Sequence, residues 1–568
     1  MQATVGLGAM ALTLVPLWQV ASALVYASYT TLGRDQGIFQ YTAFAASRGV
    51  RLYHDLRDIN GPLITAVHGL FLALGGADEH RFRTLDLVVT AVCFFVTGFL
   101  CSELSRRRPL AERVLWGVAA MSTLLVQYLR YLPWDLAQRE SFANWFMLPG
   151  IALLVAPRRG KVAHATSGAL LTAACFAKPT YALFVALQGA VVLLTKPEAG
   201  AEGLSRQRRL IAFALGAFVC AVGSVIVIAA FGDVRAFVRM YTVESRQLYG
   251  FIWPHTMREV YTLPWVTNPV RIGLSTSAVA LVLVGLRVLP WRALALVLAP
   301  VAGFGSLVMQ GKGFPYHLHP MSEPAALTWV ACAIALSHHV RRAPTLGSRV
   351  PRRMLAGGFM LALCAGASYY GTWAMRGSPH ILNPWTVAMG RTAEARMSRE
   401  YLDRFKMPDF FPYEMRQAAN YLKTTTPPDG TVQLFGMDPY LLFLSRRLSA
   451  TPYIYSYDLN TDAAWNGANE TLPEPKNIAA RDRVQAMGDE HARDLLARVA
   501  AKPAAAWVLF DRAPLSSYDT AEEDLRRTRP ELSAYLHEHY EEQASFGGIH
   551  VFLPRGPAST GLSQLPGE

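Results

Sequence analysis

Charged residues are scarce and cysteines are few in this chain of 568 residues. Charged side chains make up 17% of the residues and hydrophobic ones 52%, which excludes an ordinary soluble chain. All six cysteines fall in apolar stretches and form no CxxC pair, so neither a disulfide framework nor a zinc site is indicated. No internal repeat is detected, and the C-terminal part shows no phosphate-loop, Ser-His-Asp or metal-ligand spacing.

Long apolar runs take the place of the missing charge. From Val5 to about Trp373 the sequence consists mostly of runs of about 20 residues, enough to cross a hydrocarbon core roughly 30 Å thick. The fold class predicted is a mainly α-helical polytopic membrane protein with a C-terminal extracytoplasmic α/β domain. About eleven spans are expected, near 7–29, 84–104, 113–131, 142–156, 163–177, 180–195, 210–231, 271–289, 293–309, 320–340 and 354–374.

The net charge of +13 is explained by topology and does not require nucleic acid. Lys and Arg collect in alternate loops, as in Arg106–Arg108 and Arg341–Arg342, and such loops are retained in the cytoplasm. This places the N-terminus in the cytoplasm and the tail from Arg376 outside. The first apolar stretch lacks a basic start and a clear cleavage pattern, so it is interpreted as a retained helix.

The first external loop, residues 31–83, carries three carboxylates close to the membrane exit, Asp35, Asp55 and Asp58. Residues 37–48 and 62–74 are too short to span, so they are expected to form helices along the interface. Asp35 directly follows the first span and is a candidate general base. A solvated helix cap is the alternative explanation for a carboxylate at that point.

Three more polar clusters should reach the same outer face. Lys and Arg are depleted from external loops, so outward-facing Arg139, Lys178 and Lys312 need a reason, and one anionic ligand would supply it. Fixed cations bind phosphate oxygens and stabilise the charge that grows on a departing phosphate. The clusters comprise Gln138, Arg139 and Glu140, then Lys178 with Pro179, then Gln310, Lys312, Tyr316, His317 and His319.

The patterns D-Q-G-x(3)-Y at 35–41, R-G-V-x-L-Y-x-D at 48–55 and D-x-N-x-P at 58–62 resemble membrane glycosyltransferases of the GT-C superfamily. The branch that they resemble contains the bacterial protein O-mannosyltransferases and the lipid A aminoarabinose transferases, glycosyltransferase families 39 and 83. The segments Q-R-E at 138–140, K-P at 178–179, Q-G-K-G-F-P-Y-H at 310–317 and G-M-D-P-Y at 436–440 fit the same branch.

The resemblance implies that Asp35 activates the acceptor, with Asp55 and Asp58 in the same cavity. It also implies transfer of a sugar from a polyprenyl monophosphate, with inversion at the anomeric carbon. Relatives have Asp-Glu where this chain has Asp35-Gln36, and Lys-Pro-Pro where it has Asn60-Gly61-Pro62. The phosphate-binding role is therefore assigned to Lys312, His317, Lys178, Arg139 and Arg57, and the cavity lining to Gln36, Tyr41, Asn60, Glu140, Gln310 and Tyr316.

The tail has the composition of globular protein, and the chain is divided into a membrane domain, 1–375, and a C-terminal domain, 376–568. Apolar stretches at 431–444, 505–511 and 547–553 are expected to form strands, and the polar stretch at 478–501 a helix. The domain resembles the periplasmic domains of the same superfamily.

The predicted protein is a transferase of the bacterial inner membrane, acting at the extracytoplasmic face in cell-envelope glycan assembly. The partners are a polyprenyl-phosphate sugar donor and a lipid, glycan or protein acceptor. No cofactor or metal is required, although the three loop carboxylates could hold a divalent cation. The alternatives are a transporter or flippase, a polysaccharide polymerase or ligase with a pyrophosphate-linked donor, and a scaffold of the same fold without activity.

Overall fold

The computed structural model describes residues 20–21, 23–104, 108–129, 134–156, 160–195, 204–245, 256–342, 392–455, 458–459, 478–516 and 518–556. The chain divides into two compact units. The first comprises Met1–Leu32, Asn60–Val227 and His255–Ala393, and the second comprises Gly33–Ile59, Ile228–Pro254 and Glu394–Glu568. The predicted loop 31–83 is thus divided between the units, after Leu32 and again after Ile59.

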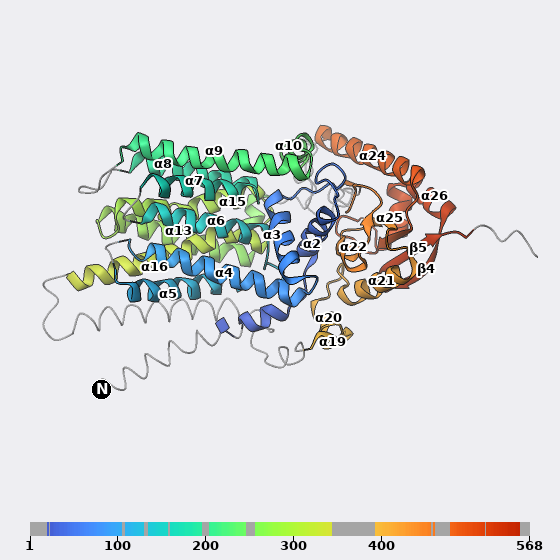
Figure 1. Cartoon of the computed structure of the whole chain (residues 1–568), viewed down its shortest axis with the longest axis horizontal. Coiled ribbons are helices and arrows are strands. Elements are labelled where there is room, and N and C mark those ends of the chain that lie inside the picture. Colours follow the sequence, from blue (N-terminus) through green and yellow to red (C-terminus); the bar gives the residue numbers. More distant parts are fainter. Residues whose placement is uncertain are drawn as a thin grey trace, which may run out of the picture. The chain divides into compact units, whose positions relative to one another are not determined.

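The first unit is built from long apolar helices that pack side by side, as Figure 1 shows. α4 packs on both α5 and α6, and α16 packs on α13 and α15. Its helices are α3 (Pro62–Gly75), α4 (Glu79–Cys101), α5 (Leu110–Tyr128), α6 (Arg139–Val155), α7 (Lys161–Cys175), η2 (Pro179–Tyr181), α8 (Ala182–Leu194), α9 (Arg206–Phe231), α12 (Met257–Thr262), α13 (Pro264–Gly285), η4 (Trp291–Ala293), α14 (Leu294–Val297), α15 (Ala299–Gln310), η5 (Pro315–Leu318) and α16 (His319–Arg342).

Nine of the eleven predicted spans correspond to these helices. Among the described residues, four helical stretches are long and apolar enough to cross a membrane: Glu79–Cys101, Arg206–Phe231, Pro264–Gly285 and Trp291–Gln310. The predicted span 354–374 lies outside the described residues, as does most of 7–29. α9 exposes large apolar side chains along its length, among them Phe218 and Ile226, as a helix facing lipid does.

Glycines allow several of these helices to approach closely. A Cβ at Gly216 of α9 would lie 1.8 Å from the carbonyl oxygen of Ala165 in α7, and one at Gly168 of α7 would lie 2.0 Å from the carbonyl oxygen of Phe213. Small residues at helix contacts let backbones come together where lipid provides no hydrophobic driving force. The α7–α9 contact therefore depends on the missing side chains.

The second unit holds a mixed five-stranded sheet with the order β2-β1-β3-β5-β4. β1 pairs in parallel with β2 and β3, whereas β5 pairs antiparallel with β3 and β4. Figure 1 labels β4, β5 and the α-helices of this unit. The strands are β1 (Thr431–Phe435), β2 (Leu448–Ser449), β3 (Ala506–Phe510), β4 (Tyr540–Phe546) and β5 (Ile549–Pro554), with α19 (Ala393–Arg396), α20 (Arg399–Leu402), η6 (Asp403–Phe405), α21 (Pro412–Thr425), α22 (Tyr440–Ser445), α24 (Ile478–Ala501), α25 (Ala521–Thr528) and α26 (Pro530–His539).

The sequence predictions for this sheet are confirmed in part. Of the stretch predicted at 431–444, only Thr431–Phe435 is a strand, because residues from Tyr440 onward form α22, and β4 was not predicted. The three predicted apolar stretches contain β1, β3 and β5, and the predicted helix at 478–501 is α24. Every residue of β3 is buried, and Trp507 lies in a core formed with residues of α24 and α26. β4 lies at the edge of the sheet and exposes Glu541, Glu542 and Gln543, as expected of a strand that must not pair with another chain.

Two earlier segments complete this unit. Residues 33–59 contribute α2 (Arg34–Ser47), and residues 228–254 contribute α10 (Val234–Val238) and the π-helix η3 (Arg239–Glu244). α2 packs on α22, and a Cβ at Gly37 would lie 2.6 Å from that of Tyr440. The helices predicted at 37–48 and 62–74 are present as α2 and α3, but residues 36–45 of α2 are all buried, unlike a helix lying along a surface.

Candidate functional site

The first unit gathers polar side chains where α6, η2 and α15 begin or end. The buried Lys178 ammonium precedes η2 and donates hydrogen bonds to Glu140 Oε1 in the first turn of α6 and to Gln310 Oε1 at the end of α15. These three residues lie far apart in sequence. Residues of the three polar clusters therefore meet, as expected of helix ends whose buried charges must find partners.

Two more predicted residues join this group. Arg139 Nη1 donates a 2.9 Å hydrogen bond to Asn60 Oδ1, so the first loop reaches the cations through Asn60. His317 Nε2 lies 3.8 Å from Glu140 Oε1. His317 is fully buried, and neither ring nitrogen has a hydrogen-bond partner within the described part of the chain.

Three cations act electrostatically on the His317 ring. Burial, followed by repulsion from Lys178, Arg139 and Lys312, holds the pKa of His317 well below its usual range. The imidazole is therefore neutral near pH 7, with one nitrogen free to donate and the other to accept. An anion placed among these cations would relieve their mutual repulsion.

Lys312 is held in a tight turn between α15 and η5. The flanking Gly311 and Gly313 both have positive φ, 62° and 67°, which only glycine adopts at no steric cost. The turn buries the lysine, and burial lowers its pKa to about 8. Tyr316 follows in η5, where its ring packs edge-on against His317 at 4.7 Å between centroids.

A layer of buried polar groups supports Glu140 and was not foreseen from the sequence. Tyr181 donates a 2.7 Å hydrogen bond to Asn144 Oδ1 and lies 3.0 Å from the Glu140 carbonyl oxygen. Asn144 in turn donates to Glu323 Oε2 at 2.7 Å. The sequence could have revealed this layer, because Asn144 and Glu323 lie inside predicted spans. Polar groups at membrane depth are costly, and they are therefore common near functional sites.

The candidate base, Asp35, lies in the second unit, in the first turn of α2, where the helix dipole stabilises a carboxylate. The preceding Arg34 pairs with Asp438 at 2.9 Å and with Asp409 at 2.8 Å, which fixes this turn. Burial raises the pKa of Asp438, Arg34 opposes this rise, and Asp409 and Asp35 add to it. Asp35 and Asp438 are therefore electrostatic neighbours.

The other two loop carboxylates have local partners. Asp58 is buried and accepts a 3.0 Å hydrogen bond from the Tyr455 hydroxyl. Asp55 is exposed; burial acts to raise its pKa, but hydrogen bonds from Arg51 and His54 lower it to about 2. Among the described residues, no group of three His, Cys, Asp or Glu side chains is arranged to hold a metal ion.

Comparison with known proteins gives the fold. No protein-family model matches the sequence, and no curated protein matches it. ArnT from Cupriavidus metallidurans in the apo state is similar over 97% of this chain and 98% of its own, with 13% identity and a TM-score of 0.50.

This chain has the fold of ArnT.

Two further solved structures are similar at lower scores. ArnT bound to undecaprenyl phosphate covers 95% of this chain and 97% of its own, with 13% identity and a TM-score of 0.49. The archaeal oligosaccharyltransferase AglB from Archaeoglobus fulgidus, in complex with an inhibitory peptide and a dolichol-phosphate, covers 87% of this chain and 69% of its own, with 11% identity and a TM-score of 0.45.

Within the ArnT-like fold, the predicted site residues fall into two sets. The first unit holds the cations and their partners, and the second unit holds the loop carboxylates. The first set is Asn60, Arg139, Glu140, Lys178, Gln310, Lys312, Tyr316 and His317; the second is Asp35, Gln36, Tyr41, Asp55, Arg57 and Asp58.

Three members of the second set have a structural explanation in the ArnT-like fold. Gln36 caps its own helix, because its side-chain oxygen accepts a 2.7 Å hydrogen bond from the Gly33 amide. The Tyr41 hydroxyl accepts a 2.8 Å hydrogen bond from the amide of Ser449 in β2. Arg57, predicted to contact phosphate, bridges two carboxylates of its own unit, so its charge is already compensated.

Proposed function

We propose that this chain is a membrane glycosyltransferase that transfers a sugar from a polyprenyl-phosphate donor to an acceptor at the extracytoplasmic face. The gathering of Arg139, Lys178 and Lys312 around His317 carries the proposal. Among the eight predicted residues grouped in that unit, three are cations and one, Glu140, is a carboxylate. This excess of positive charge suits a phosphate monoester.

The ArnT-like fold supports the same conclusion. ArnT has itself been determined in complex with undecaprenyl phosphate, a polyprenyl monophosphate. In the proposed orientation, the Lys- and Arg-rich loops and the N-terminus are cytoplasmic and the sheet-containing unit is periplasmic, in a bacterial inner membrane. The acceptor is a lipid, a glycan or a protein.

The proposed reaction is one displacement with inversion. The acceptor oxygen forms a bond to the anomeric carbon as the bond from that carbon to the phosphate oxygen breaks. Asp35 takes the proton of the acceptor hydroxyl, and the polyprenyl phosphate leaves with the electron pair. Arg139, Lys178 and Lys312 stabilise the charge that develops on the phosphate, and the neutral His317 donates a hydrogen bond to it. Metal assistance is not required by this scheme.

The test is transfer of radiolabelled sugar from polyprenyl phosphate in membranes that contain the wild-type chain or Asp35→Asn. General-base catalysis contributes roughly 10²- to 10⁴-fold, so Asp35→Asn should lose transfer by about that factor. Donor binding should be unchanged, because Asp35 is not one of the cations. Asp55→Asn is the matched control, since Asp55 is an exposed, locally paired carboxylate of the same loop, and it should retain most of the activity.

Two results would contradict the proposal. Equal transfer by wild type and Asp35→Asn would remove Asp35 from the mechanism. Binding of polyprenyl phosphate by a wild-type chain that transfers no sugar would favour a transporter or flippase, or a scaffold without activity.

A further inference from the structure

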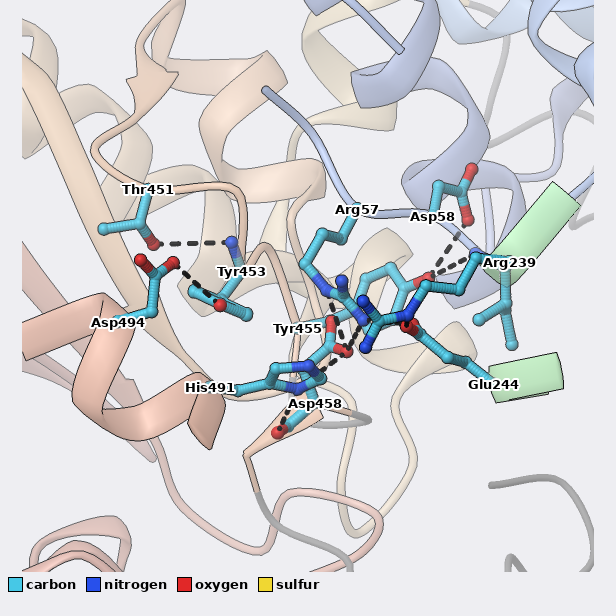
Figure 2. Close-up of polar contacts among 11 residues, drawn as sticks. Arg57, Asp58, Arg239, Glu244, Thr451, Tyr453, Tyr455, Asp458, His491 and Asp494 are labelled. Carbon is cyan, nitrogen blue, oxygen red and sulfur yellow. Dashed lines mark hydrogen bonds and ion pairs between the residues drawn. The ribbon is translucent and has the colours of Figure 1, made fainter. Parts of the chain in front are cut away.

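The second unit contains a polar pocket that the proposed reaction does not use. It has a volume of about 390 Å³, within the range of roughly 300–1,000 Å³ typical of small-molecule sites. Its wall comes from all three chain segments of that unit, with Tyr53 from the first, Arg239 from the second and Asp494 from the third. Figure 2 shows these segments meeting around Arg57.

A continuous network of ion pairs and hydrogen bonds forms the wall (Figure 2). Arg57 donates to Glu244 at 2.7 Å and to Asp458 at 2.9 Å. Arg239 Nε lies 2.7 Å from the other oxygen of Glu244, and His491 Nδ1 lies 3.3 Å from Asp458 Oδ1. Because buried members such as Glu244 and Asp458 are paired on several sides, the groups at the wall are fixed in direction.

Another part of the wall, on α24, also consists of a carboxylate that accepts hydrogen bonds from neighbouring side chains. Tyr453 donates a 2.9 Å hydrogen bond to Asp494 Oδ2, and Arg498 Nε donates to the same oxygen at 2.7 Å. Arg57 lies over the Tyr453 ring, 5.6 Å from its centroid. The pocket thus offers an aromatic residue beside planar donors and acceptors.

Two backbone features at the wall are typical of binding sites. Tyr53 has a φ of 68°, a conformation that is uncommon for residues other than glycine. The neighbouring Leu52 is held by hydrogen bonds between its amide and the Phe231 carbonyl and between its carbonyl and the Asp233 amide. Arg239 and Glu244 lie on η3, a π-helix, and such helices are frequent at functional sites.

The charge balance decides the class of ligand. The lining holds four arginines and four carboxylates, so the pocket has no net charge when its two histidines are neutral. An anionic ligand would gain from the arginines but be repelled by an equal number of carboxylates. A ligand rich in hydroxyl groups can donate to the carboxylates and accept from the arginines at the same time.

We propose that this pocket binds a neutral, hydroxyl-rich glycan through Arg239, Asp494 and Arg498. Binding in itself is independent of catalysis. The further conclusion that this glycan is part of the acceptor rests on the proposed function.

The experiment measures binding of mannotriose and of chitotriose to the full-length chain by saturation-transfer NMR and calorimetry. The chain is solubilised in an amine oxide detergent, because alkyl maltosides carry a sugar that would compete. Arg239→Ala and Asp494→Ala each remove hydrogen bonds to a charged group and should weaken binding about tenfold or more. Both side chains are well exposed, 64% and 41%, so the variants should fold.

The matched control is Arg493→Ala, which removes an exposed arginine of the same helix that does not line the pocket, and it should bind as wild type does. Asp35→Asn should also bind the glycan while losing transfer, so binding and catalysis can fail separately. The proposal is overturned if neither glycan binds the wild type, if the two pocket variants bind as wild type does, or if inorganic phosphate binds at the pocket more tightly than the glycans do.

Discussion

The side chain of Lys312 is buried, where a positive charge is costly because it is removed from water. Desolvation lowers the pKa of its ammonium from 10.5 to about 8, so the free protein loses this proton as the pH rises through about 8. The unfolded chain keeps the proton up to about pH 10.5. Stability should therefore increase with pH between these two values, because in that window the folded state no longer contains the buried charge.

Donor binding should show the opposite trend. Between pH 7 and pH 9 the protonated fraction of a group with a pKa of about 8 falls about tenfold, so affinity for polyprenyl phosphate should fall by up to that factor. Lys312→Arg keeps its proton and should remove most of this dependence. Affinity measured at both pH values checks the prediction, and an equal decline in Lys312→Arg would contradict it.

Individual site residues could be predicted from the sequence only where a residue departed from the usual distribution of charge in membrane proteins. Lys178 and Lys312 lie in loops that the charge pattern of the sequence predicts to be external, where cations are depleted, and both act electrostatically on His317. The sequence around Arg57 gave no indication of which carboxylates it pairs with. Glu244 lies 187 residues and Asp458 lies 401 residues further along the chain, and pairing over such distances leaves no local signal.

Among the helices, the α7–α9 pair shows how backbone contact sets stability. Gly216→Ala would place a methyl group 1.8 Å from the Ala165 carbonyl oxygen, which the two backbones must separate to accommodate. Overpacking of this kind costs about 1–3 kcal/mol, so the melting temperature of the solubilised chain should fall by several degrees.

The same helix supplies the control. Beyond the nearby backbone of α9 itself, a Cβ at Gly223 would meet no atom of the described residues within 4 Å, so Gly223→Ala should leave stability unchanged or raise it by up to about 1 kcal/mol. The measurement is the melting temperature of both variants and of the wild type in the same detergent. A loss of stability that is equal in the two variants would show that the α7–α9 approach is not the cause.

Element predictions succeeded where local pattern determines structure. Helices of the first unit follow apolar runs, and β1, β3 and β5 follow short apolar stretches bounded by polar ones, so composition alone located them. β2, β4, the helix α22 and the burial of α2 were missed. The two residues of β2 have no pattern of their own, and α2 is buried because α22 packs on it, about 400 residues away in the sequence.

The whole molecule is organised by a unit that draws on three separate parts of the chain. A fragment of residues 394–568 would contain the residues of all five strands. It would lack Arg34, the partner of buried Asp438, and Arg57, the partner of buried Asp458. Asp458 would keep His491 at 3.3 Å, but Asp438 would lose its arginine, and leaving a buried charge unpaired costs about 3–5 kcal/mol, a large part of the stability of a domain. We therefore expect the fragment to be unfolded or readily degraded.

Limited proteolysis and near-UV circular dichroism would measure this. The same fragment joined through a Gly/Ser linker to residues 33–59 should be more resistant, because both arginines return. A fragment 394–568 that unfolds cooperatively with the full stability of the unit would contradict the prediction.

Arg57 and Asp458 are 401 positions apart in the sequence, so their ion pair can form only after a delay during biosynthesis. At roughly 5–20 residues per second, a ribosome needs about 20–80 s to synthesise this stretch. Throughout this interval Asp458, one of the two carboxylate partners of Arg57, does not yet exist, so a nascent chain released early carries this ion-pair network incomplete and open to quality-control proteases.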